Sequence, residues 1–428
     1  MVIVSVKRHV LYTVLMLKNN KIISLIHDQF NRINEGGPLL LARNLFLFLL
    51  TPFLLLTVLG VRFLRPLVLI RFGELISSRI GHFAANTEIY LCERDLGMHG
   101  KRGLDIFYIN SSVSNRQLMK MWGRILPISP FAAGLDMLNR ALPGGREHRI
   151  PYRNDQDKDM YGVLESTEAH INFTDYEERS GRESLKKFGI SGGSPFVCFL
   201  SRSPDYLDTV FPKGSWHYHG YRDSDISNFV PAAVELTRRG YFAIRMGAAV
   251  NEKLKADNPM VIDYAAKYRT DFLDIYLSAR CRFHLGDNGG FNCVPMIFRR
   301  PLAIVNMIPL EYAPTWGSNY LFIPKKLWLR EEGRFLSFRE ILSSEIGKFH
   351  YSRQYEESGI KVIENTPEEI TALAVEMDLR LRDKWEMSKS DEELQQRFWG
   401  LFKASGINRI FRSRIGAEFL RQNRELLG

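Results

Sequence analysis

The chain has 428 residues, of which 45% are hydrophobic and 25% are charged. These globular proportions exclude wholesale disorder, and the length predicts two domains with extensions. The net charge of +10 favours anionic partners such as phosphates or acidic lipids, but no dense Lys/Arg cluster interleaved with aromatic residues indicates nucleic-acid binding.

Residues 1–66 are predicted to form a helical, membrane-associating segment. The uncharged run at 44–61 (NLFLFLLTPFLLLTVLGV) is at the lower edge of the length of a membrane span, and basic residues flank it on both sides. It starts too late for a signal peptide, and Pro52 would kink a helix there. We expect a monotopic or re-entrant segment that docks on the cytoplasmic face of the membrane, with basic residues attracted to anionic lipid. A membrane-spanning helix and a buried hairpin are the alternatives.

Residues 67–185 are predicted to form a first Rossmann-like domain. The apolar run at 65–73 (RPLVLIRFG) is typical of a central parallel strand, and further strands are predicted at 105–110, 124–129 and 169–173. Helical stretches separate the first three of these strands. This alternation indicates an α/β domain.

A second Rossmann-like domain is predicted at 186–340, after a linker near 174–194. Strands and helices alternate along it: strands at 195–203, 242–247, 282–286 and 301–307, and helices at 225–241 and 270–281. This order predicts right-handed crossovers and a parallel sheet. Residues 341–428 are predicted to be mostly helical. The expected fold class is α/β, with two doubly wound domains that face a cleft, an N-terminal apolar helical extension and a helical C-terminus.

Polar residues follow each predicted strand of the second domain, at the edge where such sheets bind ligands. After the third strand the chain reads GDNGG, and a glycine-rich turn between a strand and a helix lets backbone N–H groups approach a phosphate. A turn needed only for tight packing is the alternative. The residues predicted to bind a nucleotide-bearing ligand are Arg202, Tyr221, Arg222, Arg245, Gly247, Asn288, Gly289, Gly290 and Lys325.

In the first domain, His82 is predicted to face the same crevice. It follows Gly81 at the start of a predicted helix, and a histidine with its ordinary pKa of about 6.5 suits the removal of a proton from a hydroxyl. A histidine that caps the helix or packs under the loop is the alternative, and carboxylates such as Glu88 are rival bases. Arg79, Gly81 and Glu88 are predicted to lie on the acceptor side.

The stretch WHYHGYRDSD at 216–225 first suggests a metal site, because His217 and His219 have an alternate spacing. A metal needs three or four ligands, and the run contains a glycine and precedes a helix. We therefore expect a loop that contacts a sugar or phosphate through His219, Tyr221 and Arg222. No metal and no cofactor are expected. The four cysteines form no C-x-x-C pair, which favours a reducing cytoplasm.

Several of these stretches together resemble a family of bacterial glycosyltransferases from surface-carbohydrate gene clusters. The resemblance covers roughly residues 60–345 and rests on LVLIRFG, RIGHFAANTEIYLCERD, YHGYRDSDISNFVPAAVELTRRGYFAIRMG, IDYAAKYRTDFLDIYLSARC and PLAIVN. It implies a GT-B-like fold, with a nucleotide-sugar donor held mostly by the second domain and an acceptor by the first. The matching motif positions are Arg79, Gly81, His82, Tyr218, Tyr221, Arg222, Asp223, Asp225, Arg245 and Gly247.

One position departs from the family's pattern. Where the resemblance implies a turn rich in Ser and Thr, this chain has Asp287 and Asn288. A carboxylate beside a diphosphate is unfavourable unless a cation compensates it.

Taken with the resemblance, the sequence predicts a metal-independent glycosyltransferase at the cytoplasmic face of the inner membrane. It would transfer a sugar from a nucleotide-sugar to a surface glycan or lipid-linked acceptor, with His82 as the base or the acceptor-orienting group. The alternative, favoured by Asp287, is a non-catalytic nucleotide- or carbohydrate-binding scaffold of the same fold. A metal-dependent hydrolase built on His217 and His219 is a third hypothesis.

Overall fold

The computed structural model describes most of the chain after residue 51, in two compact units. The described residues are 52–100, 103–152, 157–191, 193–204, 217–250, 252–403 and 407–428. The smaller unit contains residues 52–70 and 134–149, and the larger contains 71–133 and 150–428. Most of the predicted membrane-associating segment therefore lies outside the described residues.

The smaller unit consists of a helix over residues 52–63, the chain that follows it, and residues 134–149. Leu54 is buried, and its Cδ1 lies 3.1 Å from the position that a Cβ on Gly134 would occupy. Arg62 donates from Nη2 to Oδ1 of Asn139 at 2.8 Å. Among the described residues, no helix is both long and apolar enough to cross a membrane.

The larger unit is built on a seven-stranded sheet in which every neighbouring pair is parallel. Its strands are β3 (Phe196–Leu200), β4 (Phe242–Arg245), β5 (Val261–Ile262), β6 (His284–Asp287), β7 (Leu302–Met307), β8 (Tyr320–Pro324) and β12 (Arg414–Ile415). Their order in space is β12-β8-β7-β6-β3-β4-β5. The chain runs from β3 outward to β5 and then returns to β6 on the other side of β3, so the strand order reverses between β3 and β6. The predicted parallel α/β core is confirmed.

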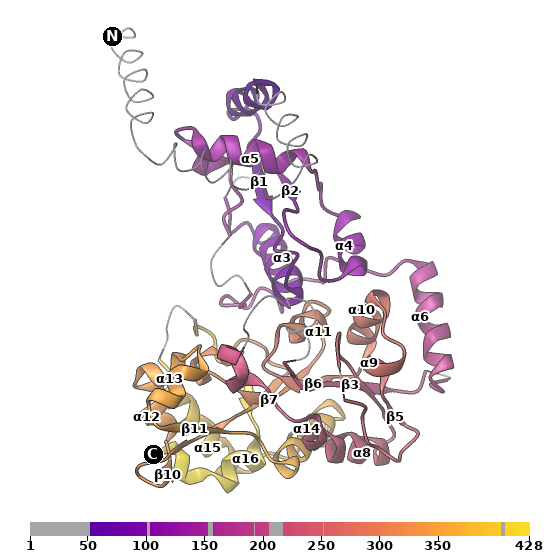
Figure 1. Ribbon diagram of the computed structural model, residues 1–428, viewed down its shortest axis with the longest axis vertical. Helices are drawn as coiled ribbons and strands as arrows, with labels where there is room; N and C mark the ends of the chain where they lie inside the picture. Colours follow the sequence, from indigo (N-terminus) through magenta and orange to yellow (C-terminus); the bar gives the residue numbers. More distant parts are fainter. Residues whose placement is uncertain are drawn as a thin grey trace. The chain divides into compact units, whose positions relative to one another are not determined.

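Helices cover both faces of this sheet (Figure 1). Every residue of β6 and β7 is buried, as expected of parallel strands with both faces covered. On one face Phe199 packs in a cluster with residues of α8 (Val230–Arg238) and α14 (Pro367–Leu381). On the other face Cys198 packs with Leu277 of α10 (Asp271–Arg280). Successive side chains of β3 point to opposite faces of the sheet, so this strand packs against a helix layer on each face.

Several helix starts follow the capping signals in the sequence. Oγ1 of Thr366 accepts from the backbone N–H of Glu369, whose side chain accepts from the backbone N–H of Thr366 in return, a capping box at the start of α14. Asp225 caps η3 (Ile226–Phe229), which leads into α8. The predicted linker near 174–194 instead contains the helix α6 (Asp175–Lys187).

The first predicted domain is smaller than expected. β1 (Ile70–Glu74) and β2 (Leu104–Tyr108) form a two-stranded sheet, to which residues 124–129 add one bridge, between Phe107 and Ile128. The helices that follow these strands are α3 (Ile80–Asp95), which packs on α11 (Cys293–Ile297), and α4 (Arg116–Gly123), which packs on α10. A separate doubly wound first domain is therefore not confirmed.

The strand predicted at 169–173 does not form, because its side chains are used elsewhere. His170 pairs with Asp95 of α3, and Phe173 stacks on Phe298 with ring centroids 5.7 Å apart. These contacts fix the segment as an irregular connection.

The C-terminal region is mostly helical, as predicted, but it also contributes strands. In addition to α14, its helices are α12 (Phe338–Leu342), α13 (Ser352–Glu357), α15 (Lys389–Leu401) and α16 (Ala417–Gln422). Two further helices lie earlier in the chain, α5 (Phe131–Ala141) and α9 (Tyr264–Lys267). A small antiparallel sheet contains β9 (Lys326–Leu329), β10 (Arg334–Phe335) and β11 (Ile360–Ile363). β12 returns to the edge of the main sheet, so this region completes the larger unit.

Candidate functional site

A cavity of about 870 Å³ opens at the carboxyl ends of β3, β4 and β6. It lies where the strand order reverses, and a doubly wound sheet binds its ligands in the crevice at this point. The volume is within the range of small-molecule sites. All the residues that line it belong to the larger unit.

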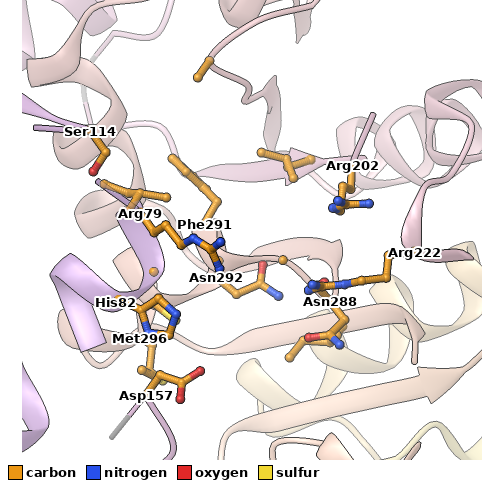
Figure 2. Close-up of a pocket in the computed structure, with 18 of the residues that line it drawn as sticks. Arg79, His82, Ser114, Asp157, Arg202, Arg222, Asn288, Phe291, Asn292 and Met296 are labelled. Carbon is orange, nitrogen blue, oxygen red and sulfur yellow. The ribbon is translucent and has the colours of Figure 1, made fainter. Parts of the chain in front are cut away.

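Arg202 and Arg222 are two of the arginines that line this cavity (Figure 2). Arg202 follows β3 and forms an ion pair with Asp223. Arg222 ends η2 (His217–Arg222) and donates from Nη2 to the carbonyl oxygen of Asn288 at 2.5 Å. Its Nε is buried and has no hydrogen-bond partner among the described residues. Burial, followed by the positive charge of Arg202, lowers the pKa of Arg222. A bound anion would relieve this repulsion.

Asp287 does not face the cavity, although it ends the strand beside these arginines. Its carboxylate is fully buried and accepts from the backbone N–H of Arg202 at 2.6 Å, from Oγ of Ser224 and from Nδ2 of Asn306 at 2.9 Å. Burial raises the pKa of Asp287 to about 6. The conflict between Asp287 and a diphosphate that the sequence suggested does not arise, because this carboxylate instead ties the β3 loop to β6 and β7.

The glycine-rich turn lines the cavity with Asn288, Gly289 and Gly290. A Cβ added to Gly81 at the start of α3 would lie 2.8 Å from Cα of Gly290, so the backbone at Gly81 packs directly against the backbone of the glycine-rich turn. The helical segment after the turn is short, a 3-10 turn (η4, Gly290–Asn292) followed by the five-residue α11. Packing thus accounts for Gly81, and the charge for holding an anion comes from the arginines more than from a helix dipole.

The start of α3 supplies the opposite wall of the cavity. Figure 2 shows Arg79 and His82 on this side, across from Arg202 and Arg222. Nδ1 of His82 lies 3.2 Å from Oδ1 of Asn86. A proton on Nδ1 would be held by this contact, which leaves Nε2 as the acceptor. The chemistry required of a base is therefore available at His82.

Arg245 and Lys325, both predicted to bind the ligand, do not line the cavity. Arg245 is buried, and its Nη1 donates to the carbonyl of Glu252 at 2.7 Å and approaches Asp263 at 3.4 Å. Its guanidinium therefore anchors the loop after β4, and Gly247, two residues further on, reaches the cavity instead.

Lys325 does not line the cavity but contacts the backbone of the loop that does. Its buried Nζ donates to the carbonyls of Tyr221 at 3.2 Å and Asp223 at 2.7 Å, and burial lowers its pKa. It thus holds η2 and the residue after it in place. Tyr221 and Arg222 line the cavity, and their contact with a ligand stays a prediction.

Glu88 lies in a buried cluster away from the cavity. Oxygen, sulfur and nitrogen atoms of Glu88, Cys92 and His170 lie within 4.8 Å of one another, which is metal-ligand spacing. Nη2 of Arg299 lies 2.8 Å from Oε1 of Glu88 and 3.5 Å from Sγ of Cys92. Burial lowers the pKa of His170, but hydrogen bonds to Cys92 and Glu88 outweigh this effect and raise it to about 10. Two cations already neutralise the cluster, which is a structural link between α3 and α11.

Sequence reasoning missed an aromatic end of the cavity. Tyr312 and His350 line it together with His219, and Nε2 of His350 lies 2.9 Å from Oη of Tyr312. Burial, then Arg222 and Arg202, lower the pKa of His219 to about 4, so it is neutral at pH 7. These cationic neighbours oppose a metal at His219, while the side chain of His217 lies outside the described set. The sequence position of Tyr312, shortly after β7, could have predicted that it lies at this edge of the sheet.

One wall of the cavity is apolar. It contains Met296 of α11, Leu302 and Ile304 of β7, and Trp316. Nε1 of Trp316 is buried without a partner among the described residues. This part of the cavity suits an apolar ligand segment that carries a hydrogen-bond acceptor.

Neither a protein-family model nor a curated protein sequence matches the chain. The solved structures that are similar to it include the following two. One is a glycosyl transferase family 9 protein from Veillonella parvula, with 13% identity over 60% of this chain and 86% of that chain and a TM-score of 0.40. The other is the E. coli ADP-heptose lps heptosyltransferase II, with 13% identity over 73% of this chain and 100% of that chain and a TM-score of 0.39. At this level of similarity, the function has to be argued from the site itself.

Proposed function

We propose that this protein is a glycosyltransferase that binds a nucleotide-sugar in the cavity between β3 and β6. The observation that carries the proposal is the pair Arg202 and Arg222, two cations that line a cavity at the reversal point of the sheet. Asp223 forms an ion pair with Arg202, whereas Arg222 donates to the backbone carbonyl of Asn288. A diphosphate supplies the missing negative charge and accepts from both guanidinium groups.

In this proposal the same arginines stabilise the leaving group. The acceptor hydroxyl attacks the anomeric carbon of the donor sugar, the bond from that carbon to the diphosphate oxygen breaks, and Nε2 of His82 takes the hydroxyl proton. The electron pair leaves with the diphosphate, where Arg202 and Arg222 meet the growing charge. Fixed guanidinium groups thus do the work that a metal does elsewhere, and the proposal includes no metal or cofactor.

The apolar wall supports an acceptor with an apolar portion, such as a lipid-linked glycan. We place the reaction at the cytoplasmic face of the inner membrane of a bacterium, in the synthesis of a surface polysaccharide. All four cysteines are free and three are buried, as suits a reducing compartment. A nucleotide-sugar donor fits the same location, because nucleotide-sugars are made in the cytoplasm.

The test measures binding and turnover separately. Thermal shifts are recorded with UDP, GDP, ADP and CDP, and dissociation constants are measured for the one that binds. A ligand at one hundred times its dissociation constant stabilises the fold by about 2.7 kcal/mol. Arg222→Met keeps the length of the side chain and removes a charged hydrogen bond worth about 1.5–3 kcal/mol, so binding should weaken roughly 10- to 150-fold.

Arg353→Met is the matched control, because Arg353 lies exposed on α13. His82→Ala should abolish transfer from the nucleotide-sugar and leave nucleotide binding intact. If none of the four nucleotides shifts the melt, the donor site is refuted. Tight binding without turnover in the wild-type protein would leave the scaffold alternative, which has lost the support of Asp287 because that carboxylate is buried.

A further inference from the structure

An apolar surface in the smaller unit has no counterpart elsewhere in the described chain. Seven large hydrophobic residues within sixteen positions are exposed there: Phe53, Leu56, Leu59, Phe63, Leu64, Leu67 and Val68. Phe63 and Leu67 are each 86% exposed, the highest fractions among the exposed large hydrophobic residues. Contiguous apolar patches of this kind mark interaction sites.

The surface is not simply the outside of a poorly packed helix. Leu54 and Val58, one turn apart, are buried, whereas Phe53, Leu56 and Phe63 point outward at helical spacing. The helix is therefore two-sided, with an inner face held on its unit and an outer face left apolar. A helix with this division lies along an interface.

Charges around the surface favour an anionic partner. The described part of the smaller unit contains five arginines (62, 65, 140, 146 and 149) and two carboxylates (Asp136 and Glu147), a net charge of +3. Residues 1–51 add six Lys or Arg residues against two acidic residues in sequence. A symmetric dimer through this surface would bring the same positive charges together, because both copies present the same patch. An anionic lipid surface attracts them instead.

We infer that this surface, residues 53–68, docks the protein on a membrane that contains anionic phospholipid. The helix over residues 52–63 buries Leu54 and Val58 on its own unit, so its inner face does not meet lipid. Its outer face instead enters the boundary between headgroups and acyl chains, with the arginines at headgroup level. The inference is independent of the proposed sugar transfer, because it uses no residue of the cavity.

The experiment is flotation of the full chain with vesicles of phosphatidylcholine alone or with added phosphatidylglycerol. Wild-type protein should float with the anionic vesicles and much less with the neutral ones, and high salt should weaken binding. Phe63→Ser/Leu67→Ser should lower partition at least tenfold without loss of fold, because both side chains are exposed. Tyr176→Ser, which removes an exposed ring of α6, is the control and should float like wild type.

Light scattering and nucleotide binding complete the design. A dimer that the double variant dissociates, together with no flotation of the wild type, would assign the surface to a second copy and overturn the inference. Equal flotation of the double variant and the wild type would overturn it as well. The thermal shift with nucleoside diphosphate should be the same in the double variant and the wild type, so failure of docking and failure of the donor site are distinguishable.

Discussion

The buried carboxylate of Asp287 makes a specific prediction about stability and pH. Its pKa is about 6 in the folded protein and about 3.9 in an unfolded chain. Between these values the folded state binds more protons than the unfolded state, so the free energy of unfolding falls as pH rises. Two pKa units correspond to about 3 kcal/mol in total, lost as pH rises from about 3 through the folded pKa to about 7.

Asp287→Asn should remove this dependence while nearly keeping the shape of the side chain. The amide cannot accept from all three donors, which lowers stability by a constant amount at every pH. Only the difference between wild type and variant is diagnostic, because burial also raises the pKa of Asp274, to about 7. That difference, in favour of wild type, should shrink by about 2 kcal/mol from pH 4 to pH 6.5.

The assay is urea unfolding at half-unit pH steps, followed by tryptophan fluorescence and analysed with a common m value. Asp257→Asn is the control, because Asp257 is exposed in a loop and its substitution leaves the buried carboxylate of Asp287 in place. A difference between wild type and Asp287→Asn that stays flat across this range would refute a buried, ionising Asp287.

Two further substitutions test how the cavity is held. Gly81→Ala should destabilise the protein by about 1–3 kcal/mol and weaken nucleotide binding, because the new Cβ meets the backbone of Gly290. Gly123→Ala is the control and should do neither, because a Cβ at Gly123 has open space around it. Equal melting temperatures for the two variants would contradict the close approach of Gly81 and Gly290. Lys325→Met should lower the free energy of unfolding by about 1–3 kcal/mol and raise the dissociation constant for nucleoside diphosphate, because the carbonyls of Tyr221 and Asp223 lose a buried donor. Calorimetry that shows unchanged affinity would refute the role of Lys325 in holding this loop.

The central sheet could be predicted because its strands are continuous apolar runs that end in polar or glycine residues. β3, β4 and β7 follow this pattern, whereas β6 contains His284 and Gly286 and was found from its place between the neighbouring helices. β5 and β12 contain two residues each, too few for any pattern, and their pairing depends on neighbours that are distant in sequence.

The same reasoning explains which site residues were found. Arg202 and Arg222 lie in loops beyond the strand ends, and loops at this edge of a parallel sheet meet one another. Arg245 is still within β4, where position in sequence does not tell which layer the side chain enters. Lys325 contacts a residue 102 positions away, and no local signal carries such a pairing.

The arginine pair also has a consequence for the catalytic cycle. In the proposed reaction the diphosphate keeps its contacts with Arg202 and Arg222 after the sugar has gone, and its negative charge has increased. The proposal therefore predicts that the nucleotide product is held at least as firmly as the donor and leaves slowly. It also predicts that inorganic phosphate competes for the same two guanidinium groups, so that the apparent affinity for the donor depends on the buffer.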